Sequence, residues 1–112
     1  MRLIKDMLAA VETALLSVSD NVGHFFPIDG TKTHIVYAED TEASSQSGDN
    51  HKLAQAVQGT IDLYARTDDV GMADQIQAAL DKSRISFSLN SVLFEDDQKT
   101  QYIHYEWLFE VT

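Results

Sequence analysis

The ten residues VQGTIDLYAR, at positions 57–66, decide how this chain folds. Small or apolar side chains occupy every second position, and polar or aromatic side chains occupy the positions between them. Only a β-strand turns a period of two into one apolar and one polar face. We therefore predict a long strand over residues 54–66, whose polar face carries Gln58, Thr60, Asp62, Tyr64 and Arg66.

The C-terminal third of the chain predicts a β-hairpin with a turn at residues 95–100. Its second strand alternates strictly, so that one face is apolar and the other carries Tyr102, His104, Glu106, Leu108 and Glu110. In its first strand the apolar positions change from odd to even numbers near Asn90-Ser91. Without an interruption this change would turn half of the apolar side chains to the wrong face, so we expect a β-bulge or a kink there.

Two amphipathic helices are predicted in the rest of the chain. Residues 3–18 place apolar side chains at spacings of three and four, and the polar residues and glycine of segment 19–23 favour a helix end. A second helix is expected to start from N-cap candidates at residues 67–69 and to run to Leu80.

Three segments are expected between the first helix and the long strand. Residues 22–26 are compatible with a short extended segment, and residues 34–38 are rich in β-branched and aromatic side chains, which favours a strand. Residues 39–50 contain four acids, three serines and no large apolar side chain. This composition predicts a solvated loop.

The order helix, strand, strand, helix, strand, strand predicts one α+β domain over residues 1–112. We expect a mainly antiparallel sheet of about four strands, with both helices packed on one face. The other face mixes polar and aromatic side chains, which is typical of a contact surface, although a solvated sheet face is the alternative. The candidate subunit-contact residues are Tyr102, His104, Glu106, Asp62 and Tyr64.

Composition and charge limit the classes of function. The 18 acidic and 8 basic side chains give a net charge of −10, which argues against nonspecific binding to nucleic acid or anionic membranes. The absence of cysteine from the sequence excludes disulfides and thiolate nucleophiles. Charged residues interrupt the N-terminal apolar run, so we expect no signal peptide, no membrane helix and an intracellular protein.

Motifs for enzymatic chemistry are missing from the sequence. The five glycines are isolated, the four histidines lack the spacing of a zinc-binding helix, and the acids at 95–97 lack the pattern of a calcium loop. The best pair is His104 and Glu106, which share a strand face where a carboxylate could orient a general base. Because no nucleophile accompanies them, we favour a structural hydrogen bond and predict no enzyme activity, cofactor or metal.

Five short segments follow one another along most of the chain: GHF at 23–25, IVY at 35–37, GDN at 48–50, GTIDLY at 59–64 and YIHYEW at 102–107. In this order, and with the second helix, they resemble the small tail-terminator or tail-completion proteins of long-tailed phages and prophages. The resemblance extends to head-tail joining proteins and minor tail components.

This resemblance implies an α+β fold with its helices on one side of a sheet. It also implies a structural homo-oligomer, usually a hexameric ring, that caps the tail tube and joins it to the head connector. Such a ring has no enzymatic activity or cofactor, lies in the virion tail and is made in the host bacterial cytoplasm. Its channel passes DNA without binding it specifically, and the net charge of −10 has the sign that this requires.

Two other classes of function stay open. The first is a small enzyme or ligand-binding domain that uses the sheet face around His104 and Glu106, which requires a concave pocket beside them. The second is a soluble adaptor that binds one protein through the same face. A ring differs from an adaptor because every subunit needs two different complementary patches.

Overall fold

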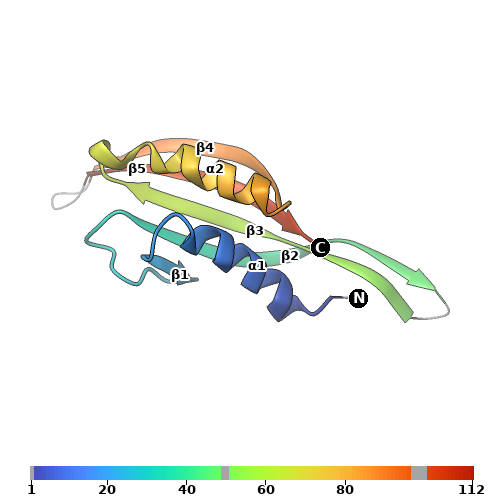
Figure 1. Ribbon diagram of the computed structural model, residues 1–112. Coiled ribbons are helices and arrows are strands. Elements are labelled where there is room, and N and C mark those ends of the chain that lie inside the picture. The colour runs from blue at the N-terminus through green and yellow to red at the C-terminus, as the bar shows by residue number, and fades with distance from the viewer. Residues whose placement is uncertain (1, 49–50, 97–100) are drawn as a thin grey trace.

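The computed structural model describes residues 2–48, 51–96 and 101–112, and for residues 44–48 and 51–53 it describes the backbone. Within these ranges the chain forms two helices, a 3₁₀ turn and five strands (Figure 1). In chain order they are α1 (Ile4–Leu16), β1 (Val22–His24), β2 (His34–Gly48), β3 (His51–Ala65), η1 (Thr67–Asp69), α2 (Met72–Lys82), β4 (Ser86–Asp96) and β5 (Gln101–Val111).

The five strands form one mixed sheet in the order β1-β2-β3-β5-β4. The pairs β2–β3, β3–β5 and β4–β5 are antiparallel, whereas β1 runs parallel to β2. Both helices cover the same face (Figure 1). The predicted α+β class is confirmed, but the sheet has five strands rather than about four. The additional strand, β1, has only three residues, which is too short for alternation to reveal it or its direction.

Asn21, the residue before β1, anchors the segment that connects β1 to β2. Its side-chain amide donates two hydrogen bonds, to the carbonyls of Asp29 and Thr33, each at 3.0 Å. Phe25 adopts a positive φ of 68°, and a Cβ at Gly23 would lie 1.9 Å from the carbonyl oxygen of Phe26. Only glycine therefore fits at position 23, where the chain folds back closely on itself.

The prediction of a loop over residues 39–50 is wrong for residues 39–48. These residues form the second half of β2 and pair with β3 as far as Gly48↔His51, whereas residues 49–50 lie outside the described residues. Backbone hydrogen bonds form this ladder whatever the side chains, and three register shifts interrupt the alternation that would have revealed it. The resulting two-stranded ribbon extends beyond the helices and gives the molecule its length of 56 Å (Figure 1).

The hairpin and its bulge are confirmed. β4 and β5 pair antiparallel, and the register shifts between Leu89 and Ser91, which leaves Asn90 as the extra residue. Glu95 and Asp96 were predicted in the turn but are the last residues of β4, and residues 97–100 lie outside the described residues. The bulge restores the phase of the alternation, so Val92 pairs with Tyr105 and faces the helix side.

The predicted N-cap of the second helix is wrong. Residues 67–69 form η1, and α2 begins at Met72 after Gly71, without a side-chain cap. The Asp69 carboxylate instead accepts a hydrogen bond from the hydroxyl of Thr33, whose oxygen accepts the backbone N–H of Arg66 at 3.0 Å. The Asp69 side chain, which the local sequence pattern assigns to the helix N-cap, thus makes a tertiary hydrogen bond instead.

The first helix is shorter than predicted. α1 spans residues 4–16 rather than 3–18, so both ends lie inside the predicted range.

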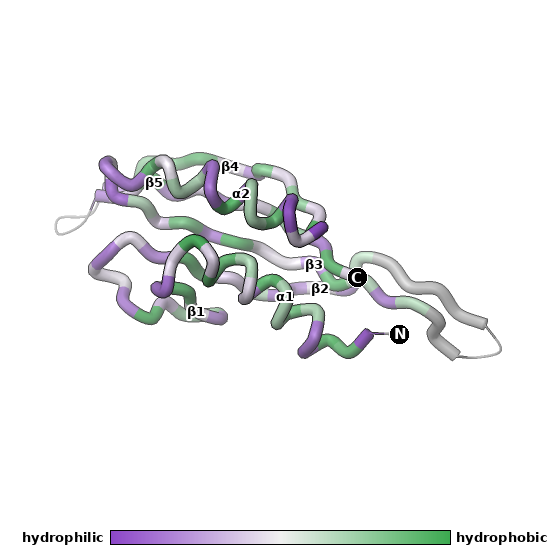
Figure 2. The backbone as a smooth tube through the Cα atoms, in the orientation of Figure 1, coloured by the Kyte–Doolittle hydropathy of each residue, from purple (hydrophilic) through white to green (hydrophobic). Residues whose placement is uncertain are grey.

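The core lies between the helices and one sheet face. Hydrophobic residues recur along both helices (Figure 2), and their buried side chains meet those of β3 and β5. Fully buried members include Met7, Val11, Leu15, Ile61, Leu63, Ile76, Leu80 and Trp107. Burial of each such side chain contributes about 1.5–3 kcal/mol to folding. None of the helices in the described ranges is long and apolar enough to span a membrane.

Trp107 is fully buried, and its indole N–H donates to Gln77 Oε1 on α2 at 3.0 Å. We expect Trp107→Ala to lower the free energy of unfolding by about 3–5 kcal/mol, because it leaves a large cavity. Leu108→Ala is the matched control: Leu108 is the next residue of β5 and is 44% exposed on the opposite face, so its loss should cost less than about 1 kcal/mol. Urea unfolding would measure both, and equal losses would contradict this placement of the core.

Candidate functional site

The five candidate contact residues lie on the sheet face opposite the helices. Cross-strand pairing between β3 and β5 places Asp62 beside Glu106 and Tyr64 beside His104. Tyr102 adjoins Tyr64, with the ring centroids 6.2 Å apart. The structure thus brings together the residues that the alternation assigned to one face. Their role as subunit contacts stays a prediction.

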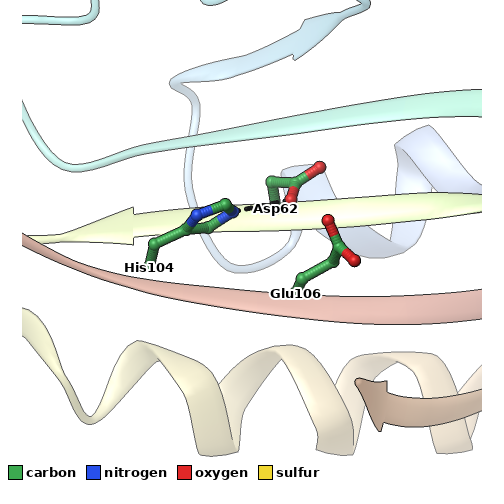
Figure 3. A group of neighbouring side chains, drawn as sticks. All are labelled: Asp62, His104 and Glu106. Atoms are coloured by element: carbon green, nitrogen blue, oxygen red, sulfur yellow. Dashed lines mark hydrogen bonds and ion pairs between the residues drawn. The ribbon is translucent and has the colours of Figure 1, made fainter. Parts of the chain in front are cut away.

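His104 lies at the centre of this face and contacts a carboxylate at each ring nitrogen. Figure 3 shows its contact with Asp62. Its Nε2 is 2.7 Å from Asp62 Oδ1, and its Nδ1 is 2.7 Å from Glu95 Oε1. When both carboxylates are ionised they accept hydrogen bonds, and the ring must then supply two N–H donors, which is the imidazolium form. A doubly protonated ring has no lone pair for general-base catalysis. The expected structural rather than catalytic role of His104 and Glu106 stays a prediction.

Burial and the neighbouring carboxylates shift the pKa of His104 in opposite directions. Burial by itself lowers the pKa of His104, but the hydrogen bonds that its ring donates to Asp62 and Glu95 outweigh it and raise the pKa above its usual 6.5. Burial raises the pKa of Asp62, and the neighbouring Glu106 carboxylate adds to this rise while His104 opposes it. Burial, with the negative charges nearby, raises the pKa of Tyr64 to about 12. The imidazolium therefore stabilises a locally acidic surface.

Aromatic rings continue across three strands from the histidine. Tyr64 stacks on His104 at 4.2 Å and on His34 at 4.8 Å between ring centroids. Tyr102 contacts His34 edge-on at 5.5 Å, and the Arg66 guanidinium lies 5.4 Å from the Tyr102 ring centroid. The stack restricts the orientation of the His104 ring, because neighbouring planes limit its rotation.

Tyr102 is the candidate contact residue that the chain itself covers. Its hydroxyl donates to the carbonyl of Gly30, in the segment between β1 and β2, and its side chain is only 7% exposed. A hollow of about 410 Å³ adjoins it and is lined by Pro27, Gly30, His34, Tyr64, Glu95, Asp96 and Tyr102. Neither His104 nor Glu106 lines this hollow, although the enzyme alternative requires a pocket beside both residues.

Two important members of the group were missed at the sequence level. Glu95 was assigned to a solvated turn, but as part of β4 it contacts His104. Asn90, the extra residue of the bulge, donates from Nδ2 to Glu106 Oε1 at 2.8 Å. The phase change near Asn90 marked the bulge, but the hairpin register had to be known before either partner could be identified.

The comparisons with known proteins add no family assignment. A scan against protein-family models finds no match, and a search of curated proteins finds no significant one. The tail-terminator resemblance therefore rests on the ordered segments of the sequence.

The raised pKa of His104 predicts how its contribution to stability changes with pH. Because the folded state holds the proton more tightly than the unfolded chain, this contribution is complete below the unfolded pKa of 6.5 and is lost as pH rises through the folded value. The free energy of unfolding of the native chain should exceed that of His104→Gln by an amount that shrinks from about pH 5.5 to about pH 9. Urea unfolding across this range measures it. The buffer contains EDTA so that trace metal ions do not contribute.

A second comparison attributes this pH dependence to the two carboxylates. In an Asp62→Asn, Glu95→Gln background, the same His104→Gln substitution should give a stability difference that varies less with pH, since both groups that raise the pKa are neutral. An equally steep dependence in both backgrounds would contradict the assignment.

Proposed function

We propose that the protein is a structural subunit of a phage or prophage tail, a tail-terminator or tail-completion protein that forms a ring. The observation that carries this proposal, beside the resemblance of the sequence, is a sheet with two open edges of different character. A closed ring needs such unlike patches, because each subunit contacts its two neighbours through different surfaces.

The first edge is β4, the last strand of the sheet order. Its outer backbone groups have no partner strand within the described residues. Four apolar side chains along it are between 48% and 59% exposed: Leu89, Val92, Leu93 and Phe94. An open strand edge with exposed apolar side chains favours pairing with another chain.

The second edge is formed by β1 and by the part of β2 that continues beyond it. β1 pairs with β2 only as far as His24↔Tyr37, so the outer edge of residues 38–48 has no partner strand in the described part of the chain. The segment that follows β1 exposes Phe25, Phe26 and Ile28 by 51–76%. The two edges thus differ in length and in their apolar groups, and this difference supports a head-to-tail contact.

The acidic charge supports the same proposal. Glu39, Asp40 and Glu42 lie on β2, where the sequence predicted a loop, and Glu95 and Asp96 end β4. In a ring, a channel of predominantly negative potential would let DNA pass without retaining it. The proposed partners are the tail-tube and head-connector proteins, the proposed location is the virion tail after synthesis in the host cytoplasm, and the ring size implied by the resemblance is six.

The alternatives have less support. Enzyme activity at His104 and Glu106 lacks a free imidazole nitrogen, since carboxylates contact both nitrogens. A soluble adaptor would bind one partner through the outer sheet face and would need neither edge, whereas a ring needs two different complementary patches.

Assembly tests the proposal directly. Light scattering from about 10 μM to about 1 mM should show growth toward a closed oligomer, and purified tail tubes should acquire a cap. Phe94→Glu at the β4 edge and Phe26→Glu at the β1 edge should each prevent ring closure, because each introduces a charge into a proposed contact. Ile4→Glu, at the start of α1 and on neither edge nor the outer sheet face, is the control for an added charge at an exposed apolar position.

Mixing the two edge variants distinguishes a ring from other assemblies. Each variant keeps one intact edge, so the mixture should form a heterodimer and nothing larger. A chain that is monomeric at every concentration and does not associate with tail tubes would contradict the proposal. Loss of assembly in only one of the edge variants would contradict a head-to-tail ring, which needs both edges.

A further inference from the structure

The group around His104 has a second property that the ring does not require. Asp62, His104 and Glu106 each direct one potential ligand atom into the same space, and these atoms all lie within 4.8 Å of one another. Figure 3 shows the Glu106 carboxylate turned toward this space from β5 and Asp62 approaching it from β3. The set comprises one imidazole nitrogen and two carboxylate oxygens, which are donors that divalent transition metals accept.

The two carboxylates are directly opposite each other in the sheet register. Like charges at opposite cross-strand positions destabilise a sheet, so a positive group beside them stabilises this arrangement. In the structure the His104 imidazolium is the positive group, and Asp62, Glu95 and Glu106 surround it with three carboxylates. The group therefore carries more negative charge than one imidazolium neutralises, and a divalent cation would balance it better.

The partner of the other ring nitrogen provides a separate argument. Metal-binding histidines usually donate their remaining ring N–H to a carboxylate or carbonyl, which fixes the tautomer and aims the ligand nitrogen. Glu95 Oε1 accepts from Nδ1 at 2.7 Å and thereby directs Nε2 at Asp62. Asn90 Nδ2 supports the second carboxylate ligand in the same way, through its 2.8 Å hydrogen bond to Glu106.

The ligand positions are also held by the fold. Asp62 and His104 come from the interiors of β3 and β5, the two central paired strands, and their side chains are 16% and 12% exposed. Tyr64 stacks on the imidazole and limits its rotation. Sites built on paired strands keep their geometry better than sites on loops, and the residual exposure leaves access for an ion and its water ligands.

We propose that Asp62, His104 and Glu106 bind one divalent transition-metal ion, with Glu95 and Asn90 orienting the ligands. The ion replaces the proton between His104 Nε2 and Asp62 Oδ1, which is released to solvent, and water completes the coordination. Zn²⁺ and Mn²⁺ match the mixed nitrogen and oxygen donors, whereas three donors with one imidazole are too few and too soft for Ca²⁺. The ion would crosslink β3 and β5 on the face opposite the core.

Calorimetric titration of ZnCl₂ into the EDTA-stripped full chain tests the site. We expect one ion per chain, and a loss of affinity of about tenfold or more in His104→Gln and in Asp62→Asn. Glu95→Gln should weaken binding by about tenfold through the orientation of His104. His24→Gln is the matched control: His24 also contacts a carboxylate, Glu39 at 2.6 Å, but lies outside the group, so its loss should leave the affinity unchanged.

A measurement on the native chain avoids dependence on the folding of the variants. Substoichiometric MnCl₂ should broaden the NMR signals of residues 62, 104 and 106 while those of residues 46 and 54, paired far along the β2–β3 ribbon, persist, because paramagnetic broadening falls steeply with distance. Broadening centred elsewhere, no saturable binding up to about 1 mM ion, or equal affinity in native and His104→Gln proteins would overturn the proposal. Both readouts are obtained on monomers and are independent of ring formation.

Discussion

The packing of two helices on one face of β3 and β5 is the constraint on which the rest of the structure depends. Trp107, Ile61 and Leu63 are fully buried beneath the helices. Because strand side chains alternate, a slip of one residue would bury Asp62 and expose Ile61, which costs both apolar burial and desolvation of a charge. The core therefore determines the register, and the register determines which side chains share the outer face.

The acidic group on that face is a consequence of this arrangement. The pairing that buries Ile61 opposite Trp107 also places Asp62 opposite Glu106. His104 lies one cross-strand pair away, opposite Tyr64, and joins Asp62 and Glu95 through its two nitrogens. Two like charges are thus kept close by forces that act on the other side of the sheet. The positive charge of the His104 imidazolium, or of the proposed metal ion, relieves their repulsion, and in this way the core is linked to the chemistry of the surface.

The helices also leave the ends of the sheet uncovered. α2 contacts β4 and α1 contacts β1, β2 and β5, yet the part of β4 from Leu89 to Phe94 keeps apolar side chains exposed, and the ribbon of β2 and β3 extends beyond the helices. Soluble proteins usually protect such edges with charges, with bulges or by pairing them. The bulge at Asn90 and the acids at the end of β4 provide part of this protection. Assembly into a ring would cover the remaining apolar surface at both edges.

The sequence by itself determined the features that depend on side-chain periodicity. The alternation at residues 57–66, the apolar spacing of both helices and the phase change near Asn90 predicted β3, α1, α2 and the bulge, since each needs one face to be apolar. The five residues of the outer face followed from the same alternation. Only the tertiary structure decided the second half of β2 and the direction of β1, because backbone hydrogen bonds carry no side-chain signal. It also decided that Glu95 reaches His104 and that Asp69 binds Thr33 instead of capping a helix. Contacts between residues distant in sequence depend on how paired strands and packed helices align, and no local pattern records that alignment.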